Sequence, residues 1–149
     1  MGQSLPSERL RPLQQLADNR ESDAARGLLE AQRLLTDRQA RHVELCRYRE
    51  DYECQGSAAT PQLLRNRQAF IERLREAERF QLQLVEQAQR GVDQSRAHWL
   101  LQQRETRTVA QLTACYLERE QRDELRREQR QYDELATQRH ARALHAEAD

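Results

Sequence analysis

The residues that could carry out chemistry in this chain are few, and their spacing does not assemble a reactive centre. Four histidines are scattered along the sequence, and the nearest two, His140 and His145, lie five positions apart, whereas two zinc-binding histidines on one helix lie four apart. No cysteine or second histidine pair completes such a site, and the four isolated glycines form no phosphate-binding loop. We therefore expect no bound metal, no cofactor and no catalytic activity.

The three cysteines predict no disulfide framework, because their number is odd. Cys46 and Cys54 lie on one predicted helix and are separated by about 12 Å along its axis, which is too far for a bridge. Cys115 belongs to a second predicted helix. We expect all three to be free thiols in a reducing compartment.

Two stripes of residues at helical spacing, one on each side of a predicted turn, are the best candidates for a binding site. We expect Leu45, Tyr52 and Leu74 to pack between the helices, and Tyr48 and Phe70 to lie partly exposed at the edge of a narrow seam. Exposed aromatic residues in one patch are typical of binding surfaces. Both stripes have spacings of four, three and four, and they consist of Arg41, Leu45, Tyr48 and Tyr52, and of Phe70, Leu74, Ala77 and Gln81.

The composition favours a thin coiled coil over a globular domain. The 149 residues are 37% hydrophobic and 34% charged, which is too little apolar material to fill a globular core. The 25 basic and 25 acidic residues balance, so no net field attracts nucleic acid or an anionic membrane. No apolar run approaches the roughly 18 residues of a membrane span, and the N-terminal residues lack the apolar stretch of a signal peptide. We expect one soluble domain over residues 1–149, not secreted and not inserted in a membrane.

Helical periodicity predicts two long helices joined by a turn at about residues 55–60. Gly56 can end a helix in the left-handed conformation, and Thr60 can cap the next helix with Pro61 at its first position. The helices are predicted over about 8–54 and about 61–142, with a heptad seam of apolar residues that thins sharply after Tyr116. Beyond it, strong helix formers continue the second helix. Because short connections join antiparallel neighbours, the predicted fold is all-α, a long antiparallel two-helix coiled-coil hairpin with a longer C-terminal helix.

Folding the chain back at about residue 57 predicts which residues of the two helices face each other. Leu45 is expected opposite Phe70, and Arg41 opposite Leu74. The second helix then extends beyond the first by roughly 30 residues or more. Since an isolated polar helix is marginal in water, we expect this overhang to fray in the free protein.

The same fold-back predicts that small residues of the two helices lie within about a turn of each other. Ala24, Ala25 and Gly27 would come near Ala88 and Gly91. Two interpretations remain open at this stage. Either the small residues allow a close approach of the helix backbones, or the glycines are only tolerated, each at about 1 kcal/mol relative to alanine.

Taken together, several short motifs resemble those of the flagellar export protein FliJ family. The resemblance covers roughly Leu10 to Arg142 and keeps the order and spacing of the family's motifs. They are Asp23-Ala-Ala-Arg, Tyr48-x-x-x-Tyr52, Phe70-Ile-x-x-Leu-x-x-Ala77, Val92-Asp93 followed by Trp99, and Asp133-Glu-Leu-Ala136.

The resemblance implies a non-enzymatic component of the bacterial flagellar type III export apparatus, similar to the central stalk subunit of rotary ATPases. Such a protein is cytoplasmic and peripherally associated with the inner-membrane apparatus. It binds the hexameric export ATPase FliI, promotes its assembly, contacts the linker of the export gate protein FlhA and is implicated in handling export chaperones. By matching positions, the gate would contact Arg41, Leu45, Tyr48, Tyr52, Phe70, Leu74, Ala77 and Gln81, and the ATPase would contact Asp133, Glu134 and Ala136.

Two alternatives stay open from the sequence. One is a homo-oligomeric structural coiled coil that tethers partners without an ATPase, which would be at least a dimer where the hairpin is a monomer. The other is the equivalent stalk protein of a virulence-type secretion system, which would share the fold and mechanism but not the exported cargo.

Overall fold

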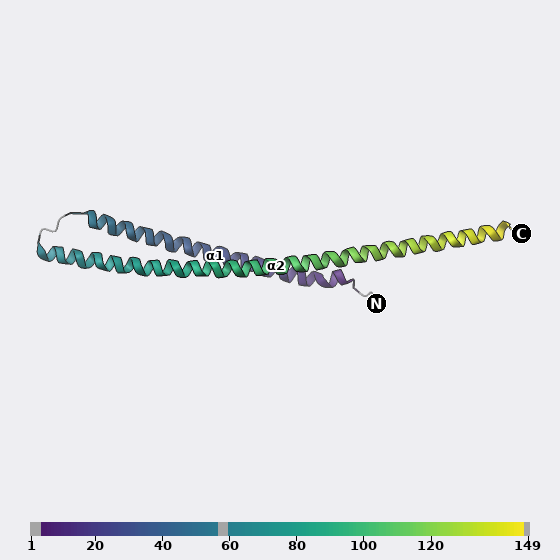
Figure 1. Ribbon diagram of the computed structural model, residues 1–149, viewed down its shortest axis with the longest axis horizontal. Coiled ribbons are helices and arrows are strands. Elements are labelled where there is room, and N and C mark those ends of the chain that lie inside the picture. Colours follow the sequence, from purple (N-terminus) through teal and green to yellow (C-terminus); the bar gives the residue numbers. More distant parts are fainter. Residues whose placement is uncertain (1–3, 57–59, 148–149) are drawn as a thin grey trace. The chain divides into compact units, whose positions relative to one another are not determined.

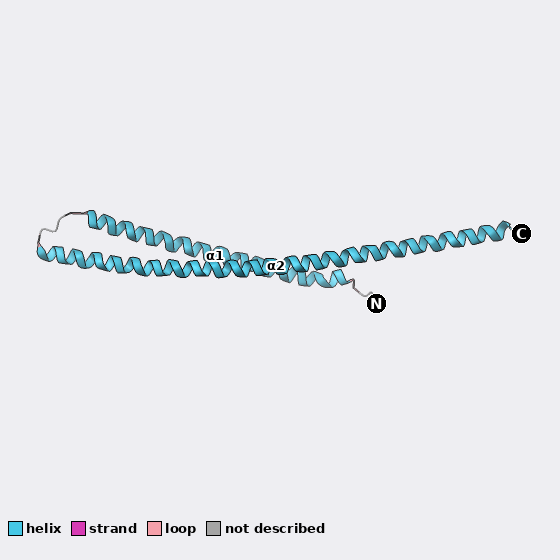
Figure 2. Cartoon of the chain, viewed as in Figure 1, coloured by secondary structure: helices cyan, strands magenta, loops and turns pink. Residues whose placement is uncertain are grey.

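The computed structural model describes residues 4–56 and 60–147, and within them the chain forms two helices (Figures 1 and 2). Helix α1 runs from Pro6 to Cys54 and helix α2 from Pro61 to Glu147. The all-α helical hairpin expected from the sequence is confirmed. The predicted starts and ends are close to the observed ones, and the largest difference is the end of α2, which lies five residues beyond the predicted 142.

The chain divides into two compact units, and each unit pairs part of α1 with part of α2. One unit comprises residues 19–103 and contains the turn, and the other comprises residues 1–18 and 104–149. Because α1 and α2 are each continuous, the first unit is a hairpin closed by the turn. The second unit pairs the N-terminal end of α1 with the middle of α2.

The residues on either side of the turn have the conformation and the capping contact that the sequence predicts. Gly56 has a φ of 68°, the left-handed conformation that ends a helix at no steric cost in glycine. The Thr60 hydroxyl oxygen accepts a hydrogen bond of 3.2 Å from the backbone N–H of Leu63, which is the expected cap of α2. Pro61 is the first residue of α2, as predicted. Residues 57–59 of the predicted turn lie outside the described residues.

Helix α1 begins at Pro6, so Pro12 neither starts the helix nor lies in its first turn. The backbone N–H of Leu5, just before the helix, donates a 3.3 Å hydrogen bond to the Glu8 carboxylate. This is half of a capping box, in which a glutamate near the helix start reaches back to the capping residue. The cap and the fixed φ of Pro6 explain why the helix begins a turn and a half before Pro12.

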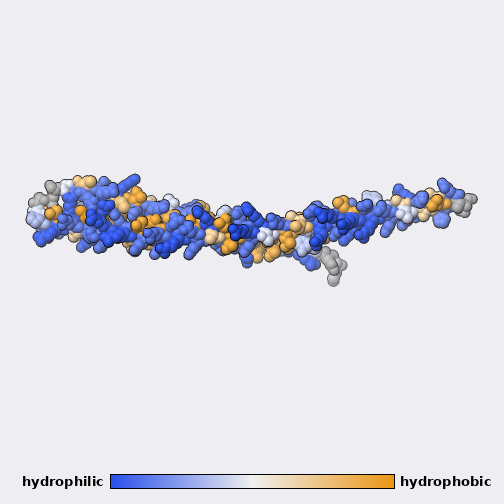
Figure 3. All heavy atoms as spheres, viewed as in Figure 1, coloured by the Kyte–Doolittle hydropathy of each residue, from blue (hydrophilic) through white to orange (hydrophobic). Residues whose placement is uncertain are grey.

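A narrow seam holds the two helices of unit 19–103 together. Side chains with reduced exposure recur every three or four residues along both helices, which is the heptad pattern of a coiled coil. The most buried are Ala24, Leu74, Ala88 and Val92, at 2 to 8% exposure. Three of these four are small, and no large side chain among the described residues is completely buried. In Figure 3 the visible surface is accordingly dominated by hydrophilic residues, with hydrophobic residues in small separate patches.

The expected register between the helices is wrong by about one heptad. Phe70 was expected opposite Leu45, but its ring packs against Tyr52, seven residues further along α1, at a centroid distance of 4.7 Å. The side chain of Arg67 reaches the last carbonyls of α1, so the first turns of α2 extend past the end of α1 (Figure 1). A shift of seven residues is two helical turns and brings the same faces together, so heptad periodicity alone could not detect it.

The same shift decides between the two interpretations of the small residues. Ala24 and Gly27 line a shallow groove with Gln94, Ser95 and His98, and Ala88 and Gly91 do not line it. A Cβ atom added at Gly27 or at Gly91 would meet nothing described within 4 Å apart from the adjoining backbone of its own helix. Of the two interpretations, the close approach of the backbones at these glycines is therefore absent, and the glycines are only tolerated in the helices.

We expect Gly27→Ala and Gly91→Ala to stabilise the protein by about 1 kcal/mol each, because alanine restricts the unfolded chain and fits both helices. Chemical denaturation followed by circular dichroism measures this. The matched control is Gly56→Ala, which should destabilise, since alanine is strained at a φ of 68°. A loss of stability on substituting Gly27 or Gly91 would show that their neighbours leave no room for a methyl group.

Polar contacts join α1 to α2 in the unit of residues 1–18 and 104–149. The backbone N–H and the hydroxyl of Ser7 both donate to the Glu120 carboxylate, at 2.9 and 2.6 Å. Further along, the Thr106 hydroxyl donates to the backbone carbonyl of Ala17 at 3.3 Å. The Glu120 carboxylate thus satisfies a backbone N–H in the first turn of α1, where helix N–H groups lack partners within the helix.

Beyond Glu120, every described residue of α2 is exposed, from 121 to 147. This overhang of 27 residues is close to the length expected from the sequence. It includes four exposed large hydrophobic side chains with exposed fractions of 51 to 70%, namely Leu125, Tyr132, Leu135 and Leu144. No described part of α1 shields them.

We expect the backbone amides of residues 121–147 to exchange hydrogen rapidly in the free protein, since no packed partner supports this helical segment. The internal reference is residues 74–92, which include the three buried residues of α2. Hydrogen exchange followed by mass spectrometry or NMR makes the comparison. Equal protection of the two segments would contradict the fraying of the overhang.

Candidate partner-binding site

An aromatic cluster lies near the turn, on the edge of the seam between α1 and α2. The ring of Phe70 contacts Tyr52 at a centroid distance of 4.7 Å and Tyr48 at 6.5 Å, in edge-to-face arrangements. Tyr48 is 54% exposed, whereas Tyr52 and Phe70 are half-buried. The structure thus brings together the three aromatic residues that the sequence singled out, and leaves Tyr48 the most accessible.

The corrected register makes the two predicted stripes coincide. In the expected register, residues 41–52 of α1 overlapped only partly with residues 70–81 of α2. With Tyr52 against Phe70 and with Arg49 bonded to Glu78, the two segments lie alongside each other over their whole length. The eight residues therefore lie on facing segments of α1 and α2, and we call them together the aromatic strip.

The members of the aromatic strip differ in accessibility. Leu74 is only 8% exposed and holds the helices together, as the sequence suggested. Arg41 is exposed and pairs with Asp37 at 3.2 Å. The Oε1 atom of Gln81 is buried and accepts no hydrogen bond from the described residues. Leu45, Tyr52, Phe70, Ala77 and Gln81 are half-buried, so the members most open to a partner are Arg41 and Tyr48.

Sequence reasoning missed Phe80, which is 58% exposed. It lies ten residues after Phe70 and about 80° around the helix, on the side away from Arg75. The spacing contained a signal for it, because 70, 73, 77 and 80 also follow helical periodicity. The predicted stripe on α2 ends instead at Gln81, which faces the seam and is half-buried.

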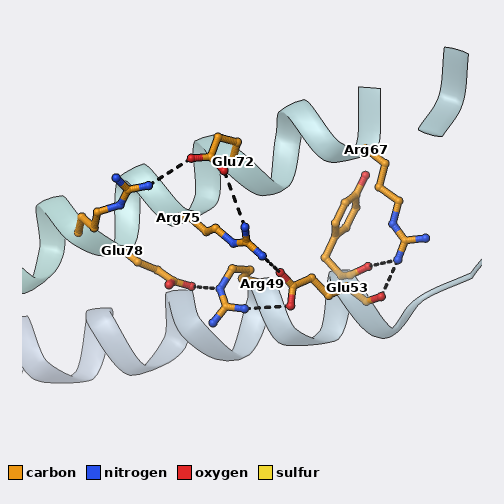
Figure 4. Close-up of polar contacts among 8 residues, drawn as sticks. Arg49, Glu53, Arg67, Glu72, Arg75 and Glu78 are labelled. Carbon is orange, nitrogen blue, oxygen red and sulfur yellow. Dashed lines mark hydrogen bonds and ion pairs between the residues drawn. The ribbon is translucent and has the colours of Figure 1, made fainter. Parts of the chain in front are cut away.

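A chain of ion pairs occupies the other flank of the same segment (Figure 4). Arg49 bonds to Glu78 across the seam at 2.5 Å and to Glu53 on its own helix at 2.9 Å. Arg75 of α2 reaches the same Glu53 at 3.2 Å. Since Arg75 follows Phe70 by five residues, it lies about 140° around the helix from it. The charged network therefore leaves the aromatic flank free.

Two groups at this network, Arg49 and the neighbouring Cys46, have shifted pKa values. The pKa of Arg49 is raised by its hydrogen bond to Glu78, so the guanidinium stays charged. The pKa of the Cys46 thiol is raised by burial and then by the nearby Glu78 carboxylate, so this thiol stays protonated at neutral pH. Cys46 contacts His42 at 3.7 Å, and all three cysteines are free.

The residues that the sequence proposed for an ATPase contact lie on the overhang. Asp133, Glu134 and Ala136 are all exposed. Asp133 and Glu134 line a shallow groove on one face of α2 together with Arg130, Thr137 and Gln138. These side chains are thus accessible in the free chain.

Within residues 4–56 and 60–147, no group of three or more His, Cys, Asp or Glu side chains is arranged to hold a metal ion. Neither described helix has a stretch long and apolar enough to cross a membrane.

Fold and site define a helical-hairpin coiled coil that carries a partly exposed aromatic cluster near its turn. A family model described as "Flagellar FliJ protein" matches residues 6–145, nearly the whole chain. The chain therefore belongs to the FliJ family, and the resemblance found from the motifs is confirmed. This membership associates it with flagellar protein export. No curated protein and no solved structure matches the chain.

Proposed function

We propose that this protein is a non-enzymatic stalk or adaptor of the bacterial flagellar type III export apparatus. The aromatic strip binds the cytoplasmic linker of the export gate protein, FlhA, and the overhang binds the hexameric export ATPase, FliI. In this function the chain promotes assembly and activity of the ATPase ring and links it to the gate. It works in the cytoplasm, peripherally associated with the inner-membrane apparatus, and also meets export chaperones.

The observation that carries the gate-binding half is the coincidence of the two stripes. The eight positions matched by resemblance to the family come from two stretches of sequence, one in α1 and one in α2, that lie alongside each other. An exposed tyrosine beside a half-buried phenylalanine gives a partner a large, rigid apolar contact at low entropic cost.

The ATPase-binding half is supported by the exposed overhang. Leu125, Tyr132 and Leu135 are each more than half exposed on a helix that no described segment covers. A solvent-exposed helix of this composition gains stability when a partner covers its apolar side chains. Binding in a central opening of a ring of ATPase subunits would provide such cover.

The direct test is ATP hydrolysis by the cognate flagellar export ATPase, measured with and without this purified chain. The chain is expected to stimulate hydrolysis at ATPase concentrations where the ring is incompletely assembled, and to have less effect once the ring is saturated. A folded chain that leaves hydrolysis unchanged at all concentrations would contradict the stalk function. The gate adaptor would then remain as the proposed function.

Light scattering tests the competing role of a homo-oligomeric tether. We expect a monomer, because α1 and α2 already bury each other's apolar faces within unit 19–103. A stable dimer at micromolar concentration would favour the tether instead.

A further inference from the structure

The side chain of Arg67 closes the C-terminal end of α1 from the opposite helix. It donates hydrogen bonds to the backbone carbonyl oxygens of Tyr52 at 2.9 Å, Glu53 at 2.6 Å, and Gly56. Figure 4 shows the guanidinium of Arg67 beside the backbone at Glu53. The last carbonyls of a helix lack partners within the helix, and a cation there also complements the helix dipole. One arginine therefore satisfies two of these helix acceptors, the Tyr52 and Glu53 carbonyls, and the Gly56 carbonyl just beyond the helix.

The same guanidinium also lies over the ring of Tyr52. Its central carbon is 5.8 Å from the ring centroid, within the range of a cation–π interaction. Tyr52 in turn contacts Phe70 at 4.7 Å, and Phe70 contacts Tyr48 at 6.5 Å. Arg67 therefore holds both the backbone and the ring of Tyr52, which is the half-buried end of the aromatic cluster.

We propose that Arg67 is a positioning residue of the gate-binding site, acting through Tyr52. It fixes the end of α1 at the level of Phe70 and orients the Tyr52 ring that supports Phe70. This inference rests on the proposed function, since it assigns the aromatic strip to a protein partner. Arg67 itself need not touch that partner.

The contacts of Arg67 affect the local geometry more than the stability of the fold. Helix α1 has 49 residues, and its seam with α2 extends far from this end. Loss of a cap at one end frays about a turn of helix and leaves the rest packed. That turn contains Tyr52, and Tyr48 lies one turn earlier. Removing Arg67 should therefore disorder the cluster while the hairpin stays folded.

The test compares Arg67→Ala with Arg75→Ala as the matched control. Arg75 also bridges α2 to the end of α1, but through the Glu53 side chain at 3.2 Å and without a backbone contact. Arg67→Ala is expected to weaken binding of the isolated gate linker about tenfold, to move the NMR signals of the Tyr52 and Phe70 ring protons, and to leave helix content nearly unchanged. Arg75→Ala should preserve both the binding and the ring signals.

A double-mutant cycle with Tyr52→Ala separates positioning from direct contact. If Arg67 acts through Tyr52, Arg67→Ala should cost less affinity in a Tyr52→Ala background than in the wild-type chain. An equal loss in both backgrounds would mean that Arg67 acts independently of the Tyr52 ring, and unchanged affinity in the single variant would show that it has no part in binding. Either result overturns the proposal.

Failure of the proposed function gives a different outcome. In that case the wild-type chain does not bind the gate linker, and the ring signals alone test the positioning. Ring signals that move only in Arg67→Ala would support the positioning of the cluster by Arg67. Ring signals that stay in place would overturn it.

Discussion

Alanine at both Tyr48 and Phe70 is expected to weaken binding of the export gate linker by at least about 100-fold. Tyr48 is the most exposed ring of the cluster, and Phe70 is the ring that both tyrosines contact. Removing the two rings deletes the centre of the aromatic strip and leaves the ion pairs on the opposite flank in place. Titration of the labelled linker with each purified variant measures the effect, and circular dichroism checks the fold.

Two control variants make this prediction specific. Tyr132→Ala removes a tyrosine that is 70% exposed on the overhang, and it should leave gate binding unchanged. Leu74→Ala removes a side chain that is 8% exposed, and it should lower the free energy of unfolding by about 2–3 kcal/mol. The aromatic double variant should be the reverse case, with binding lost and most of the stability retained. If its unfolding shifts as much as that of Leu74→Ala while binding persists, the aromatic cluster serves only to pack the helices together.

The sequence was sufficient for the parts of the fold that depend on local chemistry. Gly56, Thr60 and Pro61 end one helix and start the next through contacts within a few residues, and each does what its residue type predicts. The identity of the two aromatic stripes also follows from spacing alone. These features need no knowledge of how the helices meet.

The register between the helices depends on information that periodicity does not contain. A displacement of seven residues leaves every seam position facing the seam, and the thin core of mostly small side chains distinguishes one register from the next only weakly. In the structure the long side chain of Arg67 spans the two helices at the turn, and the Arg49–Glu78 bond spans them ten residues or so further on. Such bonds join long, flexible side chains to residues far away in the sequence. The periodic spacing of apolar residues therefore does not predict them.

The same limit explains the errors at the candidate site. The three aromatic residues lie together as expected, because their helical faces follow from their positions. Phe70 was expected opposite Leu45, and Ala88 and Gly91 were expected near Ala24 and Gly27, and both expectations failed because they used the register.

Ending the chain after Glu120 is expected to abolish stimulation of the export ATPase and to leave gate binding intact. Glu120 is the last residue of α2 with reduced exposure, and it holds the Ser7 backbone N–H and hydroxyl at 2.9 and 2.6 Å. A chain of residues 1–120 therefore keeps the bonds between Ser7 and Glu120 and every α2 residue with reduced exposure. It loses the overhang, including the overhang residues that line a groove with Leu5 and Pro6. ATP hydrolysis and linker titration on the same preparation measure the two activities separately. Full stimulation by the shortened chain would place the ATPase contact within the hairpin.

The overhang provides its own matched pair of sites for locating the contact. The sequence Asp-Glu-Leu occurs twice there, at 123–125 and at 133–135, on the same exposed helix. Replacing Asp133 and Glu134 by alanine is expected to reduce ATPase stimulation severalfold, whereas the same change at Asp123 and Glu124 should have little effect. Both variants lose the same charge from the exposed part of α2. Asp123 and Glu124 also pair with Arg126 and Arg127, at 3.9 and 3.7 Å, and line a groove with Leu5 and Pro6, so circular dichroism of both variants checks that the helix is kept. Equal loss in the two variants would mean that the ATPase responds to the overall negative charge of the overhang and does not recognise Asp133 and Glu134 in particular.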